Sequence, residues 1–327
     1  MEYRRLGKTG FEISEISLGT WQVGGKWGAD FDHQLAGNIL EEAFDQGVNF
    51  IDTADVYSGG ESEKAVGKAI RNSGKRIYIA TKCGRYINPH VDEGYTPKAL
   101  RQYVEDSLQR LQLDCIDIIQ LHCPPTQVYY RPEIFAEFEK LKEEGKILHL
   151  GVSVEKVEEA LKAIEYDNVV SVQIIYNMFR QRPHELFFQQ ALAKDVGVIV
   201  RVPLASGLLT GKFSLASRFE KGDHRFFNRN GEHFDKGETF AGIPYETGLQ
   251  AVEKLKNLFP DHSLVQLALQ WILQQKAVSC IIPGASRPEQ LVSNCAVSGQ
   301  SPLSETEMNL IAQLYEANIK THVHHNW

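Results

Sequence analysis

The sequence predicts a single α/β domain, a (β/α)₈ TIM barrel with an N-terminal β-hairpin cap and an extra C-terminal helix. Short runs of β-branched residues recur along its 327 residues, and each is followed by a segment whose apolar residues repeat with a helical period. Several runs are apolar almost without interruption, as parallel strands covered on both faces must be. Alternation through eight such units is typical of a closed barrel.

Eight runs are predicted to form the barrel strands. They are residues 16–20, 49–54, 77–82, 116–122, 148–152, 171–176, 198–202 and 279–282. Between them, helical spacing is clear where Leu100, Val104, Leu108 and Leu111 mark one face of a segment. An open doubly wound sheet is the competing architecture, and eight successive units favour the barrel over it.

Three segments depart from the repeat. Residues 3–15 predict a hairpin ahead of the first barrel strand. Residues 207–245 are rich in glycine, phenylalanine, histidine and charge, which predicts a lid or a binding loop. Residues 304–319 predict a terminal helix, with Ser304 as its N-cap and Glu307 three positions later.

Composition and charge are those of a soluble globular protein. Hydrophobic residues make up 43% of the chain and charged residues 24%, and the formal net charge is −7 with both signs interspersed. This balance argues against nucleic acid or a membrane surface as the main partner. No run of eighteen apolar residues occurs, and the first residues lack the apolar core of a signal peptide, so a cytoplasmic location is expected. No linker-like change of composition appears, so one domain over residues 1–327 is expected.

Neither the cysteines nor the histidines form a pattern that requires a metal. The five cysteines are Cys83, Cys115, Cys123, Cys280 and Cys295. They include no C-x-x-C pair, so we interpret them as reduced core thiols. Near the end of the sequence, His322, His324 and His325 precede Trp327, and a frayed, solvated terminus is expected there. No metal site is therefore predicted.

Polar residues interrupt or end three successive predicted strands. Asp52 lies inside the second strand, Lys82 ends the third and His122 ends the fourth, while Tyr57 follows in the loop after the second. Asp52 and Lys82 are expected to form a buried ion pair, and the ammonium is expected to lower the pKa of Tyr57 from about 10. Tyr57 would then donate a proton and His122 would orient a substrate oxygen. A purely structural salt bridge is the alternative, and four such residues on successive strand ends favour an active site over it.

A series of short motifs runs through the chain in a fixed order. They are Leu-Gly-Lys-Thr-Gly at 6–10, Ile-Ser-Leu-Gly-Thr-Trp at 16–21, Gly-Val-Asn-Phe-Ile-Asp-Thr-Ala-Asp-Val-Tyr at 47–57, Ile-Ala-Thr-Lys at 79–82, Leu-His at 121–122, Gly-Val-Ser at 151–153, Gln173, Pro-Leu-Ala-Ser-Gly-Leu-Leu-Thr-Gly-Lys at 203–212 and Ile-Pro-Gly-Ala-Ser at 282–286. In this order they resemble the aldo-keto reductase family over essentially the whole chain.

The resemblance implies an NADPH-dependent oxidoreductase that reduces an aldehyde or ketone to an alcohol, or works in reverse as an alcohol dehydrogenase. In that family hydride passes from C4 of the nicotinamide to the carbonyl carbon while a tyrosine protonates the oxygen. The family pattern implies Tyr57 as general acid, Lys82 and Asp52 as the pair that tunes its pKa, and His122 as orienter of the carbonyl. The expected partners are NADP(H) and a small-molecule carbonyl substrate, in a monomer or a homo-oligomer.

The cofactor has to be held without a dinucleotide-binding glycine motif, because no G-x-G-x-x-G occurs. Loops after the seventh and eighth strands of barrels commonly bind phosphate, which favours Lys212 for the pyrophosphate and Arg287 for a 2′-phosphate. Gln290 and Asn294 match the adenine contacts of the family. The full set of cofactor-binding residues implied is Thr20, Trp21, Asp52, Ser153, Gln173, Arg201, Pro203, Leu204, Ser206, Gly207, Lys212, Gly284, Ser286, Arg287, Gln290 and Asn294.

Two departures from the family pattern concern the nicotinamide. Ser153 and Gln173 match the residues that bind its carboxamide, but Val154 stands where many members have asparagine. Arg201 stands where an aromatic residue commonly stacks on the nicotinamide ring, and a guanidinium plane is also able to stack.

Two other functions stay open on the sequence. One is a regulatory subunit, because some relatives in the family bind NADPH and dock onto membrane channels with little turnover. The other is a lyase or isomerase with Lys82 as a Schiff-base amine, which Asp52 opposes by keeping the lysine protonated. Candidates for lining the substrate pocket, which is expected to be aromatic or apolar, are Trp21, Trp27, Tyr86 and residues of the 207–245 segment.

Overall fold

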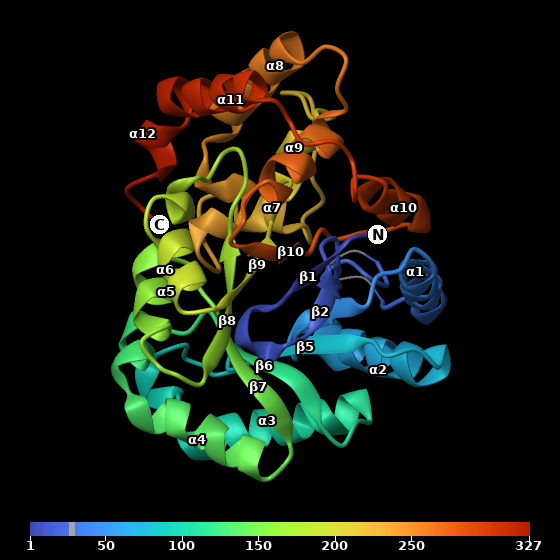
Figure 1. The fold of residues 1–327 in the computed structure, drawn as a ribbon, viewed down its shortest axis with the longest axis vertical. Coiled ribbons are helices and arrows are strands. Elements are labelled where there is room, and N and C mark those ends of the chain that lie inside the picture. Colours follow the sequence, from blue (N-terminus) through green and yellow to red (C-terminus); the bar gives the residue numbers. More distant parts are fainter. Residues whose placement is uncertain (26–29) are drawn as a thin grey trace.

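Eight parallel strands form a nearly closed barrel in the computed structural model, which describes residues 1–25 and 30–327. The strands are β3 (Leu18–Gly19), β4 (Phe50–Asp52), β5 (Tyr78–Cys83), β6 (Ile116–His122), β7 (Ile147–Ser153), β8 (Val169–Ile175), β9 (Gly197–Arg201) and β10 (Val278–Ile281). Strands that follow one another in the chain are also neighbours in the sheet. Figure 1 shows the helices arranged around these strands. The predicted fold class is confirmed.

The first and last strands of the sheet meet through two bridges, each of which joins a residue of one strand to a residue just outside the other. Ile16 forms a parallel bridge with Ile281, and Gly19 forms one with Gly284. Gly19 is needed for this approach, since a Cβ at that position would lie 2.8 Å from the carbonyl oxygen of Ile282. These contacts close the sheet into a barrel.

Helices follow the strands on the outside of the barrel. They are α1 (His33–Asp45), α2 (Glu61–Ser73), α3 (Pro97–Leu111), α4 (Pro132–Glu143), α5 (Val157–Ala163), α6 (Phe187–Ala193), α7 (His224–Phe227), α8 (Tyr245–Leu258), α9 (Leu264–Leu273), α10 (Pro288–Cys295), α11 (Glu305–Asn318) and α12 (Lys320–Val323). Helices α8 and α11 pack against each other, as Figure 1 also shows. Throughout the described ranges, every helix is too short or too polar to cross a membrane.

The predicted terminal helix corresponds to α11, and its predicted cap is present. The hydroxyl of Ser304 accepts a hydrogen bond from the backbone N–H of Glu307 at 3.3 Å. In return, the Glu307 carboxylate accepts one from the backbone N–H of Ser304 at 2.7 Å. This reciprocal arrangement satisfies two of the N–H groups that a helix start leaves unpaired.

The predicted hairpin is formed by the antiparallel strands β1 (Tyr3–Arg5) and β2 (Glu12–Ser14). Leu6 and Ile13 from this region are fully buried among inward-facing residues of the barrel strands. Gly197, the first residue of β9, lies so close to Leu6 that no side chain fits there. The hairpin therefore closes the end of the barrel at which the strands begin, and the opposite end carries the loops available for a site.

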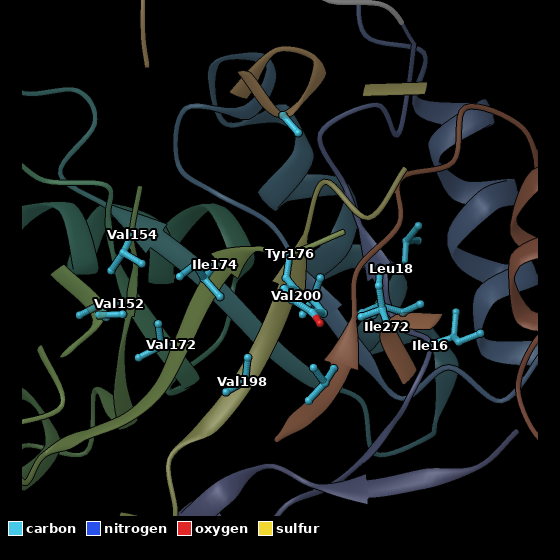
Figure 2. Close-up of a cluster of buried hydrophobic side chains, with 14 of the residues drawn as sticks. Ile16, Leu18, Val152, Val154, Val172, Ile174, Tyr176, Val198, Val200 and Ile272 are labelled. Atoms are coloured by element: carbon cyan, nitrogen blue, oxygen red, sulfur yellow. The ribbon is translucent and has the colours of Figure 1, made fainter. Parts of the chain in front are cut away.

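Side chains along each strand alternate between the barrel interior and the surrounding helices. Val152, Val172 and Val198 belong to the outer core between strands and helices, part of which Figure 2 shows. Their neighbours Ser153 and Gln173 consequently face the interior. Four of the five cysteines, all of them free, are buried, in line with their interpretation as core thiols.

The 207–245 segment is more ordered than a simple loop. It contains α7 and short 3₁₀ turns at Lys236–Glu238 and Phe240–Gly242. The fully buried side chain of Asn228 accepts hydrogen bonds from the backbone N–H groups of His233 and Phe234, both at 2.9 Å. These local bonds fold the segment onto itself.

The end of the sequence is docked, so the expectation of a frayed terminus is wrong. Trp327 is only 7% exposed. Its indole N–H donates to the Asp235 carboxylate at 2.7 Å, and the Arg180 guanidinium lies 4.4 Å from the centroid of its ring. A large amphipathic ring gains more from this contact with the 207–245 segment than from water, which is why the terminal residues are ordered.

Candidate active site

A polar layer lies above the apolar floor of the barrel. The floor residues of β4, β5 and β6 are followed two positions later by Asp52, Lys82 and Gln120, which share their inward orientation because strand side chains alternate. All three are at most 1% exposed. Parallel register places Lys82 beside Gln120 on the neighbouring strand. Charged groups buried this deeply must be paired.

Asp52 is the centre of that pairing. Its Oδ2 accepts a hydrogen bond from Lys82 Nζ at 2.5 Å. Its Oδ1 accepts bonds from the side-chain amides of Gln120 at 3.0 Å and Gln173 at 2.7 Å. Strands β5, β6 and β8 therefore each contribute one donor side chain to this carboxylate of β4, which fixes the ion pair in the barrel interior.

Lys82 connects the buried carboxylate to Tyr57, the residue that opens the 3₁₀ turn Tyr57–Gly60. Lys82 Nζ donates to the backbone carbonyl of Thr53 at 2.8 Å and lies 3.3 Å from Tyr57 Oη. Burial alone would lower the pKa of Lys82, but the charges of Asp52 and Tyr57 outweigh it and raise that pKa above its ordinary value. Lys82 is therefore a protonated ammonium that faces the phenol.

The pKa of Tyr57 differs from the expectation. Burial raises this pKa, and the nearby Lys82 ammonium lowers it by a smaller amount, so the net direction is upward from 10.0. The sequence-based expectation of a lowered pKa is wrong because it included the charge of Lys82 and omitted the cost of burying a phenolate. Tyr57 is consequently held as a phenol that carries its proton.

His122 lies beside Tyr57, with ring centroids 6.1 Å apart. Burial lowers its pKa well below the ordinary value, and the positive charges of Arg85, Lys82 and Arg201 lower it further. A neutral imidazole carries one N–H, so His122 is able to donate a hydrogen bond without bringing a charge. Its Nδ1 atom is buried and has no hydrogen-bond partner among the described residues.

Aromatic rings line the same region. The Trp21 ring lies 5.4 Å from that of Tyr57, 5.7 Å from His224 and 6.3 Å from Phe234. His224 and Phe234 come from the 207–245 segment, so that segment does contribute to the site. Tyr86 is 45% exposed and stacks instead on Tyr103. Trp27, the remaining candidate, lies outside the described residues.

Arg201 is held by two carboxylates that the sequence did not connect to it. Its NH1 donates to Glu238 Oε2 at 2.6 Å, and its NH2 donates to Glu155 Oε2 and the carbonyl of Val154, both at 3.0 Å. Burial and the charge of Glu238 raise the pKa of Glu155, whereas Arg201 lowers the pKa of Glu238 despite its burial. Glu155 is therefore the weaker acid of the two, and Glu238, at 2.6 Å, is the closer counter-ion of Arg201.

This cluster also has the donor types of a metal site. Ligand atoms of Cys123, Glu155 and Glu238 lie within 4.8 Å of one another. The Arg201 guanidinium, however, contacts both carboxylates and lies 3.6 Å from Cys123 Sγ. Arg201 thus supplies the positive charge that a metal ion would otherwise bring to these three side chains.

Several predicted cofactor residues are tied to the protein. The Thr20 hydroxyl donates to the carbonyl of Asp52 at 3.0 Å, and the Ser206 hydroxyl donates to the carbonyl of Glu238 at 3.0 Å. Ser153 contacts Cys123 at 3.4 Å, and the Gln173 amide nitrogen is directed at Asp52. At the predicted nicotinamide position, the interior hydroxyl of Ser153 and the amide oxygen of Gln173 are the hydrogen-bonding groups that these two residues offer.

The phosphate side of the predicted site is separate from this cluster. Lys212 follows β9 and Arg287 precedes α10, and both are exposed cations without an ion pair in the part of the chain that the structure describes. Ser286 donates through its backbone N–H and its hydroxyl to the side chain of Gln290, at 2.9 and 3.1 Å. Gly284 is exposed, while Asn294 is buried on α10. Cations beside the start of a helix are suited to phosphate groups.

Buried polar atoms without partners also favour a ligand at this end of the barrel. Within the described ranges, His122 Nδ1, Arg201 Nε and Glu155 Oε1 are shielded from solvent and make no hydrogen bond. Such atoms are costly unless something completes the site. Together with the unpaired Lys212 and Arg287, they fit a polar, phosphate-containing cofactor.

The sequence-based reasoning missed Gln120, Glu155, Glu238, Arg85 and Asp55. Asp55 has both carboxylate oxygens buried and unpartnered among the described residues, and burial and the charge of Glu63 raise its pKa to about 7. Gln120 and Asp55 had a usable signal, because each is a polar residue inside or just after a buried strand. Glu238 lies 37 residues from its partner Arg201, so no sequence spacing connects the two.

Comparison with known proteins identifies the class to which this barrel and site belong. A sequence model of the Aldo/keto reductase family matches residues 15–316. The aldo-keto reductase YhdN of Bacillus subtilis (strain 168) is 32% identical over 313 residues, covering 95% of this chain and 92% of its own. The NADH-specific methylglyoxal reductase of Escherichia coli (strain K12) is 30% identical over 336 residues, covering 95% and 98%.

Two further similarities show the range of the class. The solved structure of the glycerol dehydrogenase AKR11B4 from Gluconobacter oxydans has a TM-score of 0.80 and 29% identity, covering 97% of this chain and 96% of that one. A probable voltage-gated potassium channel subunit beta of Arabidopsis thaliana is 30% identical over 315 residues, covering 93% of each chain. The chain belongs to the aldo-keto reductase family. It is accordingly an oxidoreductase of a family that uses nicotinamide cofactors and acts on small carbonyl compounds.

Proposed function

We propose that the protein reduces an aldehyde or ketone to an alcohol with NADPH, and that it oxidises the alcohol in the reverse direction. The observation that carries the proposal is the 3.3 Å contact between Lys82 Nζ and Tyr57 Oη, at the end of a buried network centred on Asp52. This arrangement presents one protonated phenol beside a fixed ammonium. A carbonyl oxygen that gains negative charge needs such a proton donor.

Tyr57 donates its proton to the carbonyl oxygen as the reaction proceeds. Lys82 makes the loss of that proton less costly, because its ammonium stabilises the phenolate that forms. Asp52 keeps Lys82 charged and in place through the 2.5 Å contact. When bound, the nicotinamide supplies the hydride that reaches the carbonyl carbon.

His122 orients the carbonyl group. Its neutral imidazole donates a hydrogen bond to the substrate oxygen, so that this oxygen is directed at Tyr57, whose ring centroid is 6.1 Å away. Trp21 and Phe234 provide an apolar wall for the carbon skeleton, since their rings lie 6.3 Å apart beside Tyr57.

The cofactor would be held by two groups of residues, one in the barrel interior and one in the loops that follow β9 and precede α10. Ser153 and Gln173 bind the carboxamide, and Arg201 offers the nicotinamide a guanidinium plane whose edge is fixed by Glu155 and Glu238. The segment after β9 and the loop before α10 bind the phosphates and adenosine. The remaining residues of this set are Thr20, Trp21, Asp52, Pro203, Leu204, Ser206, Gly207, Lys212, Gly284, Ser286, Arg287, Gln290 and Asn294.

Arg287 is expected to make the protein prefer NADPH to NADH, although one relative is named for NADH specificity. Arg287 is exposed and makes no ion pair with Glu289 or with any other described residue, so its guanidinium is available to the 2′-phosphate. A charge-assisted contact corresponds to a preference of about ten- to a hundredfold. Equal Kd values for both cofactors, or a Kd ratio unchanged in Arg287→Ala, would contradict this assignment.

The proposed reaction is tested by NADPH consumption with a panel of aldehydes and ketones, followed as loss of reduced-nicotinamide absorbance. Turnover with at least one compound, together with the matching alcohol, supports the proposal. Tight NADPH binding without consumption across the panel would instead favour a regulatory subunit.

A further inference from the structure

Arg85 lies at the catalytic end of the barrel, three residues after Lys82 and two beyond the end of β5. Gly84 precedes it with a φ of +103°, and a Cβ there would meet the Tyr95 ring at 2.8 Å, so the chain turns in a way that requires glycine. The Arg85 side chain is partly buried, and its guanidinium carbon lies 5.8 Å from the centroid of Phe234. Arg85 thus lies beside Phe234 of the 207–245 segment, which lines the site.

Arg85 has no counter-ion in direct contact. Burial lowers its pKa, but nearby acidic groups, among them Glu238 and Glu155, outweigh the burial and raise that pKa without contacting the guanidinium. Across residues 1–25 and 30–327, its guanidinium makes no hydrogen bond and no ion pair. The other buried cations of the site are paired, Lys82 with Asp52 and Arg201 with Glu238. Withdrawing a guanidinium from water without a partner is unfavourable, and an arginine stays charged at any ordinary pH. The positive charge of Arg85 is therefore available to an anion that enters the site.

The charge of Arg85 influences His122, one of the proposed catalytic residues. Among the cations that lower the pKa of His122, in addition to its burial, Arg85 has a larger effect than Lys82. Ring contacts connect the same groups through space: Phe234 is 6.3 Å from Trp21, and Trp21 is 5.4 Å from Tyr57. An anion at Arg85 would therefore belong to the molecule whose carbonyl lies at Tyr57 and His122.

The cofactor phosphates do not account for this charge. Their proposed partners Lys212 and Arg287 lie beyond β9 and beside β10, whereas Arg85 follows β5. In the closed strand order, β5 is separated from β10 by β4 and β3 on one side and from β9 by β6, β7 and β8 on the other. Arg85 and the phosphate-binding residues thus lie across the mouth of the barrel from each other.

We propose that Arg85 binds a carboxylate carried by the substrate, so that the preferred substrates are aldehydes or ketones that also contain a carboxylate. The proposal rests on the proposed carbonyl reduction and specifies its substrate class. A guanidinium fork matches the two oxygens of a carboxylate, and the neighbouring Trp21 and Phe234 accommodate the carbon skeleton that connects the two groups.

The test compares 2-, 3- and 4-carboxybenzaldehyde with their methyl esters, which share the aldehyde and the skeleton but lack the charge. We expect kcat/KM for at least one acid to exceed that for its ester by about tenfold or more. Arg85→Gln is expected to abolish this ratio and Arg85→Lys to retain part of it. Lys68→Gln, which removes one positive charge from an exposed position on α2, is the matched control and is expected to leave the ratio unchanged.

Two results would overturn the assignment of Arg85. They are esters reduced as well as their acids in the wild type, and an acid-to-ester ratio that survives in Arg85→Gln. If no aldehyde is reduced, the proposed function fails, and calorimetry of the carboxylates with protein in excess NADP⁺ decides the inference separately. Binding that Arg85→Gln weakens about tenfold would still support it, and binding that is absent or unaffected would contradict it.

Discussion

Replacing Tyr57 by phenylalanine is expected to lower kcat for carbonyl reduction by about 10²–10⁴-fold while Kd for NADPH changes little. The phenylalanine ring retains the packing against Trp21 and His122, whose ring centroids lie 5.4 and 6.1 Å from that of Tyr57. Only the hydroxyl 3.3 Å from Lys82 Nζ is lost. The variant therefore separates proton donation from the shape of the site.

Steady-state kinetics and a fluorescence titration with NADPH measure the two quantities for Tyr57→Phe. Tyr86→Phe is the matched control, because it removes a hydroxyl from a tyrosine that is 45% exposed and lies on Tyr103. If Tyr57→Phe retains more than about a tenth of the wild-type kcat, Tyr57 is not the proton donor.

Lys82→Met is expected to slow reduction and to move its pH dependence. The ammonium is the main group that lowers the pKa of Tyr57 against its burial, so its removal raises that pKa further. In the proposed reaction the phenol must be protonated, so the rate is expected to decline as pH rises through this pKa. The alkaline limb of the pH–rate profile should consequently shift to higher pH in the variant.

The same substitution leaves Asp52 buried and without a counter-ion, although Gln120 and Gln173 still donate to it. Breaking a buried pair in this way costs about 3–5 kcal/mol of unfolding free energy. Lys68→Met, on the exposed side of α2, controls for the loss of one lysine. A profile that is scaled down with an unshifted alkaline limb would mean that Lys82 acts by positioning the nicotinamide.

The barrel was predictable because its signal is repeated and local. The segment 116–122 is predicted to be a strand because it is rich in Ile and Leu with few interruptions, and β6 has the same bounds. The ion pair was also predictable. Asp52 and Lys82 are polar residues on neighbouring strands of buried character, so they were expected to lie close together in the barrel interior, and they form an ion pair there.

What escaped prediction depends on burial and on contacts between distant segments. The net pKa shift of Tyr57 depends on how deeply its phenol is buried, and the depth of burial cannot be derived from the sequence pattern. The carboxylate of Glu238 reaches Arg201 only because the 207–245 segment folds back over the barrel. Trp327 docks against Asp235 of that same segment, which only the tertiary structure shows.

The central claim is that hydride and proton reach one carbonyl group at this site, and isotope transfer tests it most directly. NADPH carrying deuterium at C4 of the nicotinamide is incubated with the protein and an aldehyde that it turns over, and the alcohol is analysed by mass spectrometry and NMR. We expect one deuterium on the carbinol carbon when the labelled face of the nicotinamide is the one used, and an about 10²–10⁴-fold smaller amount of labelled alcohol from Tyr57→Phe over the same time. Alcohol without deuterium from either labelled face would contradict the account.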